Sequence, residues 1–368
     1  MLEKGKITAT QSGMILYPII MSTAMIAGPS LMMKHAMQDM WITPIWASCS
    51  GFLALFIAKQ LNQRYVNMTI IEQSQQIAGT FWGKGIGFFY VLLFLQINGF
   101  IVREYAEFIA LFLNGTPLSI VSSALVLVSA FAVRGGVEVI ARSAQIFFLF
   151  FVVPFLIMIL LILKDLEPQN ILPILDNGLL PTIRAAVIPQ GWFSEVFLLS
   201  FLLPYMSDRT NAKKAGVVTI LACLVTMIVS NLITLFVFGD VTMTLLFPIM
   251  DMARYISVAD FFENLESGVM AVWVVGVFVK VTLFYYVTVL GTAQWLNLSN
   301  FRPIVLPVGW LTILFCFWGI PDFSTVGEIN SFAIPFLLMI FFVFIPGSLL
   351  LLSTLTEKRN RTKGVDTG

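Results

Sequence analysis

The sequence has 368 residues, of which 58% are hydrophobic and only 11% are charged. Soluble domains carry about 25% charged residues, so this composition excludes a water-soluble protein and predicts an integral membrane protein. The formal net charge of +1 argues against nucleic acid as a partner.

Ten apolar runs are long enough to cross a bilayer as α-helices, each of which needs about 20 residues. Strands of a membrane barrel would alternate polar and apolar residues, whereas these runs are continuous. We therefore predict an all-α membrane protein with a single transmembrane domain over residues 1–355 and a polar, disordered cytoplasmic tail over 356–368. The predicted spans, numbered 1 to 10, cover 11–33, 41–60, 85–112, 117–133, 143–163, 189–206, 215–239, 267–290, 303–320 and 332–355.

The basic residues are distributed unevenly between the two sides of the membrane. With the N-terminus placed in the cytoplasm, fifteen of the 21 Lys and Arg residues fall in cytoplasmic segments and four in outer loops. Cytoplasmic loops of membrane proteins are enriched in Lys and Arg. We therefore expect both termini to be cytoplasmic.

Span 1 contains a run of small and hydroxyl residues that ends in Gly28, Pro29 and Ser30. Pro29 has no backbone N–H to donate, and it disfavours a helical conformation at Gly28. Freed backbone groups within a membrane are tolerated where protein or a wet cavity satisfies them, and interrupted helices form substrate sites in transporters. The pattern predicts an interruption of span 1 at a ligand site. The alternative is a proline kink with small residues for helix packing.

Residues 67–80 have the composition of a short helix on the cytoplasmic surface, before span 3. Span 3 itself carries Arg103, Glu104 and Glu107 within an apolar run. Arg103 and Glu107 are spaced to pair on one face of the helix, whereas Glu104 points about 100° away. Charged side chains inside a membrane are costly, and they mark candidate functional sites.

Span 6 opens with Pro189, carries Glu195 within its apolar run and places Ser200 farther along. A carboxylic acid in this position is a functional hypothesis by default. Without a partner its pKa would rise, which would make it a proton site. The alternatives are a structural ion pair and a protonated, hydrogen-bonded carboxyl group.

Span 8 carries Lys280, which lies too deep in the membrane to reach the interface with its side chain. Either Lys280 or Arg103 is therefore expected to partner Glu195 across the bundle. Asn98, Arg103, Glu104, Glu195 and Lys280 form the candidate proton or ion-pair network. A static scaffold of buried charges is the alternative.

Signals of enzyme chemistry are absent from the sequence. The three cysteines and the single histidine show no metal-binding spacing. Neither a Ser–His–acid set nor a phosphate-cradling loop is present. We expect no catalysis, no metal and no cofactor.

Several short motifs, taken in their order along the chain, point to a known family. Over roughly residues 5–355 the chain resembles the spore germination permease family, the B subunits of nutrient germinant receptors in endospore-forming bacteria. This family is part of the amino acid–polyamine–organocation transporter superfamily. The motifs are Lys4-Gly5-Lys6-Ile7, Ser22-Thr23-Ala24 through Pro29, Arg103-Glu104-Tyr105, Arg134-Gly135-Gly136-Val137-Glu138, Trp192-Phe193-Ser194-Glu195 ending at Pro204, Arg254-Tyr255-Ile256-Ser257 with Ala259-Asp260-Phe261, and Gly291-Thr292-Ala293-Gln294-Trp295.

The resemblance implies a five-plus-five inverted repeat in which discontinuous spans 1 and 6 enclose a small ligand. In the superfamily, exposed backbone of span 1 meets the ligand carboxylate and span 6 meets the amine. This chain departs from the family in having Ser22 where many members have glycine, with Gly28 one or two turns later. Carried over to this chain, the ligand-binding residues are Thr23, Ala24, Met25, Ile26, Ala27, Gly28, Glu195, Phe197 and Ser200.

The resemblance also implies a function and partners. The leading hypothesis is a sensor in the inner spore membrane or cell membrane that binds an amino acid or similar nutrient, assembles with A and C receptor subunits and signals germination. One alternative is a proton-coupled amino acid transporter with Glu195 as the proton carrier. Another is an ion or water channel within the receptor, which would use the same polar interior.

Overall fold

The structure is a computed structural model that describes residues 2–113, 115–256, 265–318, 329 and 331–365. Within these ranges the regular secondary structure is helical, with one isolated backbone bridge between Ile7 and Met206. The α-helices are α1 (Ala9–Ala36), α2 (Thr43–Arg64), α3 (Ile70–Phe112), α4 (Leu118–Gly135), α5 (Val137–Ile162), α6 (Leu180–Ala185), α7 (Val187–Ser194), α8 (Leu199–Leu202), α9 (Ala212–Phe238), α10 (Pro248–Tyr255), α11 (Leu265–Trp295), α12 (Val305–Phe317), α14 (Ala333–Met339) and α15 (Ile345–Val365).

Each of the ten predicted spans corresponds to a helix or to a series of helical segments. Eight helical stretches of the described residues are long and apolar enough to cross a membrane. The first of them, Ala9–Arg64, holds both α1 and α2, and the shorter apolar helix Arg302–Phe317 covers most of predicted span 9. Positions 319–320 of that span, and 257–261 with their quoted motif residues, lie outside the described part of the chain. The predicted all-helical membrane fold is confirmed.

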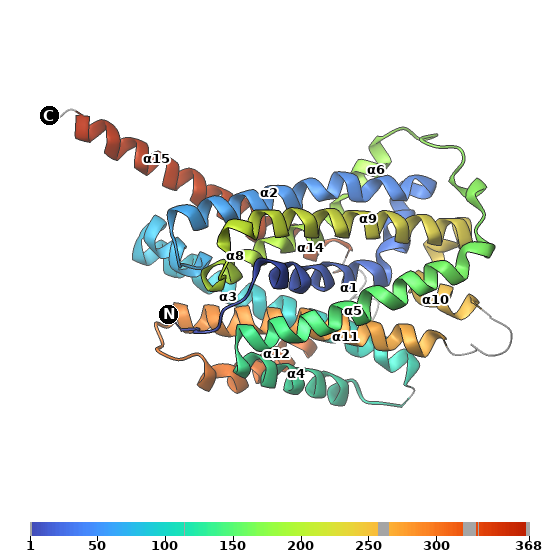
Figure 1. Cartoon of the computed structure of the whole chain (residues 1–368), viewed down its shortest axis with the longest axis horizontal. Helices are drawn as coiled ribbons and strands as arrows, with labels where there is room; N and C mark the ends of the chain where they lie inside the picture. Colours follow the sequence, from blue (N-terminus) through green and yellow to red (C-terminus); the bar gives the residue numbers. More distant parts are fainter. Residues whose placement is uncertain (1, 114, 257–264, 319–328, 330, 366–368) are drawn as a thin grey trace.

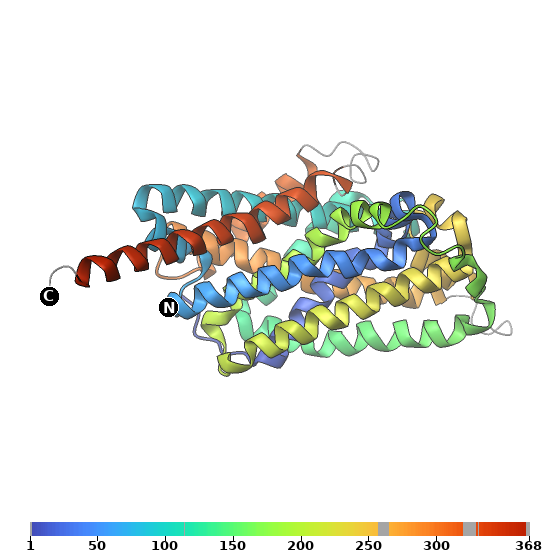
Figure 2. The same ribbon diagram turned by 90° about the horizontal axis from the view of Figure 1, so that it is seen from above.

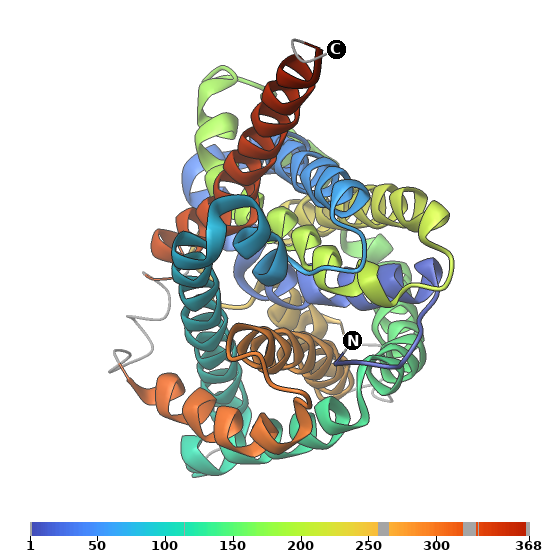
Figure 3. The same cartoon turned by 90° about the vertical axis from the view of Figure 1, so that its left-hand side faces the viewer.

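The spans form a bundle in which buried and peripheral helices are clearly separated. The N-terminus and the end of α15 lie at the same end of the bundle (Figure 1). Seen along the bundle, α1, α8 and α11 lie inside, and α4, α5 and α12 lie at the periphery (Figure 3). The most apolar part of Val187–Tyr205 is 89% buried, against 17% for Val137–Asp165. The sixth span is therefore the most enclosed, and its polar groups have to be satisfied by protein.

The predicted short helix before span 3 is confirmed as the first part of α3. The backbone of Gly79 is non-helical, with φ of 81° and ψ of 170°, so an arm over residues 70–78 is separated from the span that follows. The arm folds back onto the start of the span, where Ser74 Oγ donates to the carbonyl of Gly83 at 3.1 Å. A Cβ atom on Gly83 would lie 2.3 Å from Gln75 Cα, so only glycine permits this contact.

The interruption predicted for span 1 is absent from the structure. Helix α1 continues from Ala9 to Ala36 and contains both Pro18 and Pro29. A proline removes one helical hydrogen bond, and in membrane helices neighbouring helices and small local adjustments compensate for that loss. Pro29 is buried in this packing, so it does not end the helix. Span 6 also keeps a helical backbone, but it changes from α to 3-10 geometry over Glu195–Leu198.

The predicted disordered tail is also partly wrong. Helix α15 continues through Val365, so helical backbone extends well past residue 355. It follows directly on the π-helical turn Ile340–Phe344, which continues α14. A polar segment that follows an apolar helix can extend that helix, because the preceding turns have already met the cost of nucleation.

Candidate functional site

The sixth span changes its helix type in the interior of the bundle. Helix α7 ends at Ser194, a 3-10 segment covers Glu195–Leu198, and α8 follows. A 3-10 stretch within a helix often marks a functional or strained position. Gly191 precedes it, and a Cβ atom there would lie 2.8 Å from Pro335 Cα on α14. The backbone of span 6 therefore packs closely against α14 one helical turn before Glu195.

Glu195 forms a buried ion pair with Lys280 of α11. The Lys280 Nζ atom donates to both carboxylate oxygens of Glu195 at 2.9 Å, and each side chain is 2% exposed. The Phe284 ring lies one turn from Lys280, with its centroid 5.9 Å from Nζ. Of the two cations expected as partners of Glu195, Lys280 is therefore the one that the fold selects.

Arg103, the other candidate partner, is paired within its own helix. Its side chain contacts Glu107, with Nη2–Oε1 and Nε–Oε1 distances of 2.6 and 2.8 Å. The guanidinium carbon also lies 5.4 Å from the centroid of the Phe317 ring. The pairing predicted from the spacing of Arg103 and Glu107 is confirmed, and this pair satisfies the Arg103 charge without Glu195.

A second carboxyl group lies near the buried pair. Glu104 on α3 is 8% exposed and interacts electrostatically with both Lys280 and Glu195. We call Glu195, Lys280 and Glu104 the charged centre. It combines two acids with one base, so with all three groups ionised it carries one net negative charge.

Several buried polar side chains, some of them on the helices that carry the charged centre, have no hydrogen-bond partner among the described residues. Most buried polar groups in proteins are hydrogen-bonded, and exceptions commonly mark bound water, ions or ligands. Four of them lie on α1, α3, α8 and α11; of these helices, α11 packs against α1 and α3, and α8 packs against α1. We call these four the orphan groups: Ser22 Oγ, the side-chain amide of Asn98, Ser200 Oγ and Thr282 Oγ1.

One contact relates an orphan group to the charged centre. Ser22 on α1 faces Gly276 of α11, since a Cβ atom on this glycine would lie 3.2 Å from Ser22 Cβ. Gly276 and Lys280 are one helical turn apart on the same face of α11. Ser22 and Lys280 therefore lie on the same side of α11. The unpartnered hydroxyl and the ammonium group share one interior region.

The predicted ligand-binding residues of span 1 lie in the C-terminal half of α1. Gly28 packs against span 6, since a Cβ atom on it would lie 3.5 Å from the ring of Trp192. Ala27 is partly exposed, and the others are buried. Phe197 of span 6 instead stacks on Phe342, with ring centroids 5.9 Å apart. Spans 1 and 6 thus meet near Gly28, while Phe197 is engaged with the last span. The buried residues of the set are Thr23, Ala24, Met25, Ile26 and Gly28.

Two of the orphan groups, Ser22 and Thr282, were not among the candidate site residues chosen from the sequence. Each is a hydroxyl side chain within an apolar run, and that signal is visible in the sequence. The signal is weak, however, because serine and threonine hydroxyls usually bond to a carbonyl one turn earlier in the helix. Thr288 does so, donating to the carbonyl of Phe284 at 2.7 Å. Only the structure separates the bonded hydroxyls from the orphan ones.

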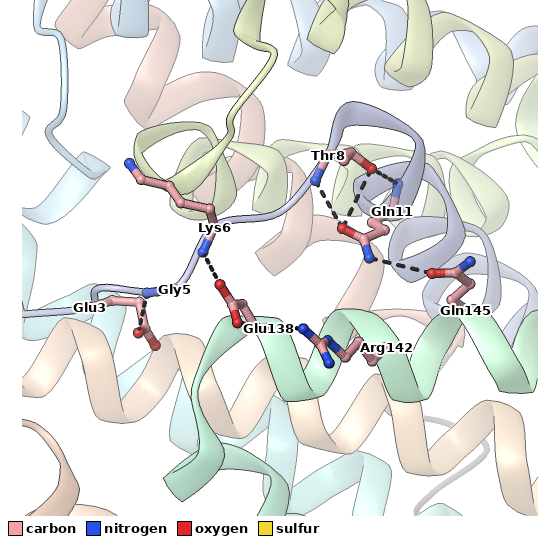
Figure 4. A network of polar contacts seen from close by, with 8 residues as sticks. All are labelled: Glu3, Gly5, Lys6, Thr8, Gln11, Glu138, Arg142 and Gln145. Atoms are coloured by element: carbon pink, nitrogen blue, oxygen red, sulfur yellow. Dashed lines mark hydrogen bonds and ion pairs between the residues drawn. The ribbon is translucent and has the colours of Figure 1, made fainter.

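A second polar cluster lies at the end of the bundle that holds the N-terminus (Figure 4). The buried Glu3 carboxylate accepts hydrogen bonds from the backbone N–H groups of Gly5 and Val137, at 2.9 and 3.0 Å. Glu138 accepts from the backbone N–H of Lys6 at 2.8 Å. These bonds attach the segment before α1 to the first turn of α5. We call residues 3–9 and their partners the N-terminal clasp.

The clasp also attaches the end of span 6. Ile7 donates its backbone N–H to the Tyr205 carbonyl at 3.0 Å, and its own carbonyl accepts from Ser207 N–H at 2.9 Å. Asp208 accepts from the backbone N–H of Ala9 at 2.7 Å. The start of α1, the start of α5 and the end of span 6 are therefore joined at one end of the bundle.

Comparisons with known proteins agree on one family. The family described as "Spore germination protein" matches residues 6–323. Spore germination protein KB of Bacillus subtilis (strain 168) is 26% identical over 84% of this chain and 83% of its own length. Spore germination protein YndE of the same organism is also 26% identical, over 84% of this chain and 86% of its own.

Two solved structures share the fold of this chain. A nucleobase-cation-symport-1 family transporter, Mhp1, in a closed conformation with bromovinylhydantoin bound, aligns over 95% of this chain and 78% of its own, with a TM-score of 0.65 and 15% identity. MhsT in complex with L-phenylalanine aligns over 96% and 99%, with a TM-score of 0.61 and 13% identity. These likenesses show an all-helical transporter fold with inverted repeats.

Proposed function

This chain belongs to the spore germination protein family, and we propose that it is the membrane-embedded B subunit of a nutrient germinant receptor. It binds an amino acid or a similar small nutrient between α1 and the sixth span, α7 to α8. Its partners are the A and C subunits of the receptor, in the inner spore membrane or the cell membrane. Both termini lie in the cytoplasm, in keeping with the excess of Lys and Arg on that side.

The observation that supports this proposal is the combination of the charged centre with the orphan groups. An amino acid brings one ammonium and one carboxylate group. Glu195 attracts the ammonium, and Lys280 attracts the carboxylate. Hydroxyl and amide groups without partners supply the hydrogen bonds that fix the orientation of a ligand in an otherwise apolar site.

Such a site can signal because the ligand and the ion pair compete. A nutrient that binds either Glu195 or Lys280 weakens their mutual contact, so ligand binding favours a conformation in which the pair is rearranged. A ligand shifts a conformational equilibrium only by its different affinities for the two states. The partner subunits then respond to the change in population.

The test replaces one carboxylate of the charged centre and follows germination. Glu195→Gln keeps the size of the side chain and removes its charge, so the nutrient concentration for half-maximal germination is expected to rise by roughly 30-fold or more, because loss of a buried charged contact costs about 2–5 kcal/mol. The nutrients to be tried are amino acids, sugars and nucleosides.

The matched control is Glu107→Gln, the same chemical change in the pair that Arg103 makes within α3. It is expected to leave the nutrient dependence unchanged within about threefold, an energy of about 0.65 kcal/mol. Immunoblots of spore membranes check that both variants are present at normal levels. A normal dose response of Glu195→Gln at normal abundance would refute the proposed site.

A proton-coupled amino acid transporter is the second candidate, and the fold favours it. Two of the solved structures that share the fold are a transporter and a protein in complex with an amino acid. A transporter has to open to each side in turn, whereas a sensor needs only two states with different affinities. Uptake of radiolabelled amino acid into proteoliposomes that contain this chain alone, driven by a proton gradient, would identify transport. Binding without uptake would identify the sensor.

A further inference from the structure

A basic groove lies away from the charged centre, between the last turns of α2, the end of span 6 and the start of α9. Its volume is about 520 Å³. Helices α2 and α9 run side by side toward the end of the bundle that holds the N-terminus (Figure 2). Residues of all three elements line the groove, so it is formed by the tertiary fold and not by one helix alone.

Three cationic side chains from different elements line this groove. Lys59 lies on α2, Lys213 lies in the first turn of α9, and Arg209 lies in the 3-10 segment just before α9. No aspartate or glutamate is among the residues that line the groove. Arg209 is held in place, since its Nη2 atom donates to the Pro204 carbonyl at 2.6 Å. The groove therefore concentrates positive charge without an internal counter-charge.

The two lysines are available to an external anion. Neither Lys59 nor Lys213 forms an ion pair with a carboxylate in the described part of the chain. The nearest acid in the sequence, Asp208, is engaged elsewhere: its carboxylate accepts from the backbone N–H of Ala9 and from Asn211 Nδ2. Within the described residues, neither lysine is therefore neutralised by a direct ion pair.

Two further features favour an anion over a general basic surface. Helix α9 begins at this groove, and its N-cap residue Asn211 makes no side-chain capping bond. The free N–H groups and the dipole at a helix N-terminus attract anions. Asn62, which lines the groove, is 9% exposed and its amide nitrogen has no hydrogen-bond partner among the described residues. The groove therefore combines charge with unused hydrogen-bond donors.

The remaining wall of the groove is apolar. Its floor is formed by the buried side chains of Leu55 of α2 and of Leu199 and Leu203 of span 6, and Val66, just after α2, adds an apolar side chain that is 53% exposed. Leu55 is one helical turn from Lys59, so the apolar and cationic surfaces adjoin each other along α2. A ligand that fits both surfaces carries a negative head and an apolar chain. An inorganic anion would use only the cationic side.

We propose that this groove binds the phosphate group of an anionic phospholipid. Lys59, Arg209 and Lys213 contact the phosphate oxygens, and an acyl chain packs against the exposed Val66. The buried Leu199 and Leu203 beneath the groove belong to the span that carries Glu195, so the lipid site adjoins the span that holds part of the charged centre. Basic side chains near a membrane surface each contribute about a fivefold gain in affinity for anionic lipid.

The experiment measures lipid retention by the full chain purified in detergent. Native mass spectrometry counts bound phosphatidylglycerol and phosphatidylcholine at equal added concentrations, and a parallel sample receives inorganic phosphate alone. We expect phosphatidylglycerol to bind preferentially. The double variant Lys59→Gln/Lys213→Gln is expected to weaken that binding by roughly 10- to 30-fold.

The matched control is Lys214→Gln, which removes the same charge from the next residue of α9. Lys214 lines a different cavity, with Thr10 and Tyr17 of α1. We expect this control to change phosphatidylglycerol binding by less than about twofold, an energy of about 0.4 kcal/mol. An equal loss in Lys214→Gln would show a general attraction of lipid to basic residues and would overturn the proposal.

One further double variant and two further binding measurements test the groove. Lys59→Arg/Lys213→Arg keeps both charges and is expected to retain lipid binding, which separates the role of charge from damage to the fold. Binding of phosphatidylcholine as tight as that of phosphatidylglycerol would overturn the proposal. Binding of inorganic phosphate as tight as that of phosphatidylglycerol would also overturn the proposal, because the anion that the groove binds would then be a soluble one.

Discussion

The charged centre and the N-terminal clasp each contain a buried carboxylate, Glu195 and Glu3, but they satisfy it in different ways. In the clasp, Glu3 accepts hydrogen bonds from backbone N–H groups, including that of Val137. In the charged centre, Glu195 and Lys280 satisfy each other, and hydroxyl and amide groups on the surrounding helices remain without partners among the described residues. A fully satisfied network stabilises one structure, whereas a partly satisfied one is suited to accept another molecule.

The two clusters also differ in the role that we expect for them: the clasp stabilises the fold, and the charged centre serves the function. The clasp joins the N-terminal segment to α5 and to the end of span 6, so its bonds cross large distances in the sequence. In the charged centre, the Glu195 carboxylate is held by one buried cation, Lys280. Removal of one partner should therefore be far more damaging in the centre than in the clasp.

The largest effect is expected for Lys280→Met. This substitution leaves Glu195 buried without its cation, and such changes lower the free energy of unfolding by about 3–5 kcal/mol. The double variant Glu195→Gln/Lys280→Met removes both charges and should recover most of that loss. The measurement is the free energy of unfolding of the purified protein in mixed micelles with increasing sodium dodecyl sulfate. Equal destabilisation of the single and double variants would show that the aliphatic chain of Lys280, and not its charge, is what stabilises the bundle.

A smaller effect is expected for Glu3→Ala in the clasp. It leaves the buried N–H of Val137 without an acceptor, which costs about 1–3 kcal/mol. Hydrogen exchange of the first amides of α5 should become faster, because the local bond that protects them is lost. The control Glu138→Ala removes a more exposed acceptor and should have a smaller effect on the same amides. Unchanged exchange in Glu3→Ala would mean that packing, and not this carboxylate, holds the clasp.

The architecture was predictable from the sequence because a bilayer requires long apolar helices. All ten spans, the short arm before span 3 and the Arg103–Glu107 pair follow from local composition or spacing. The partner of Glu195 does not, because the choice between Lys280 and Arg103 depends on how α3 and α11 are rotated about their axes. That rotation is set by packing over the whole bundle.

The errors have the same physical origin. Gly28 and Pro29 indicated an interrupted helix from local propensity, but the buried environment of α1 maintains a continuous one. The contact of Glu3 with Val137 joins positions that are far apart in the sequence, so no local pattern predicts it. Hydroxyl groups such as Ser22 and Thr288 look alike in the sequence, although only Thr288 finds a backbone acceptor among the described residues. Tertiary contacts decide each of these cases.

The smallest effect is expected for Arg142→Gln, at the exposed edge of the clasp. Arg142 Nη2 lies 4.0 Å from Glu138 Oε2, and the two side chains are 77% and 44% exposed. Exposed pairs one helical turn apart contribute about 0.3–0.5 kcal/mol, and salt screens them. Glu138 keeps its bond from the backbone N–H of Lys6 whether or not Arg142 is charged. The free energy of unfolding should therefore fall by no more than about 0.5 kcal/mol, and the difference should vanish in high salt. A loss above about 1 kcal/mol would mean that Arg142 orients the carboxylate for the backbone bond, and the clasp would then depend on paired charges as the centre does.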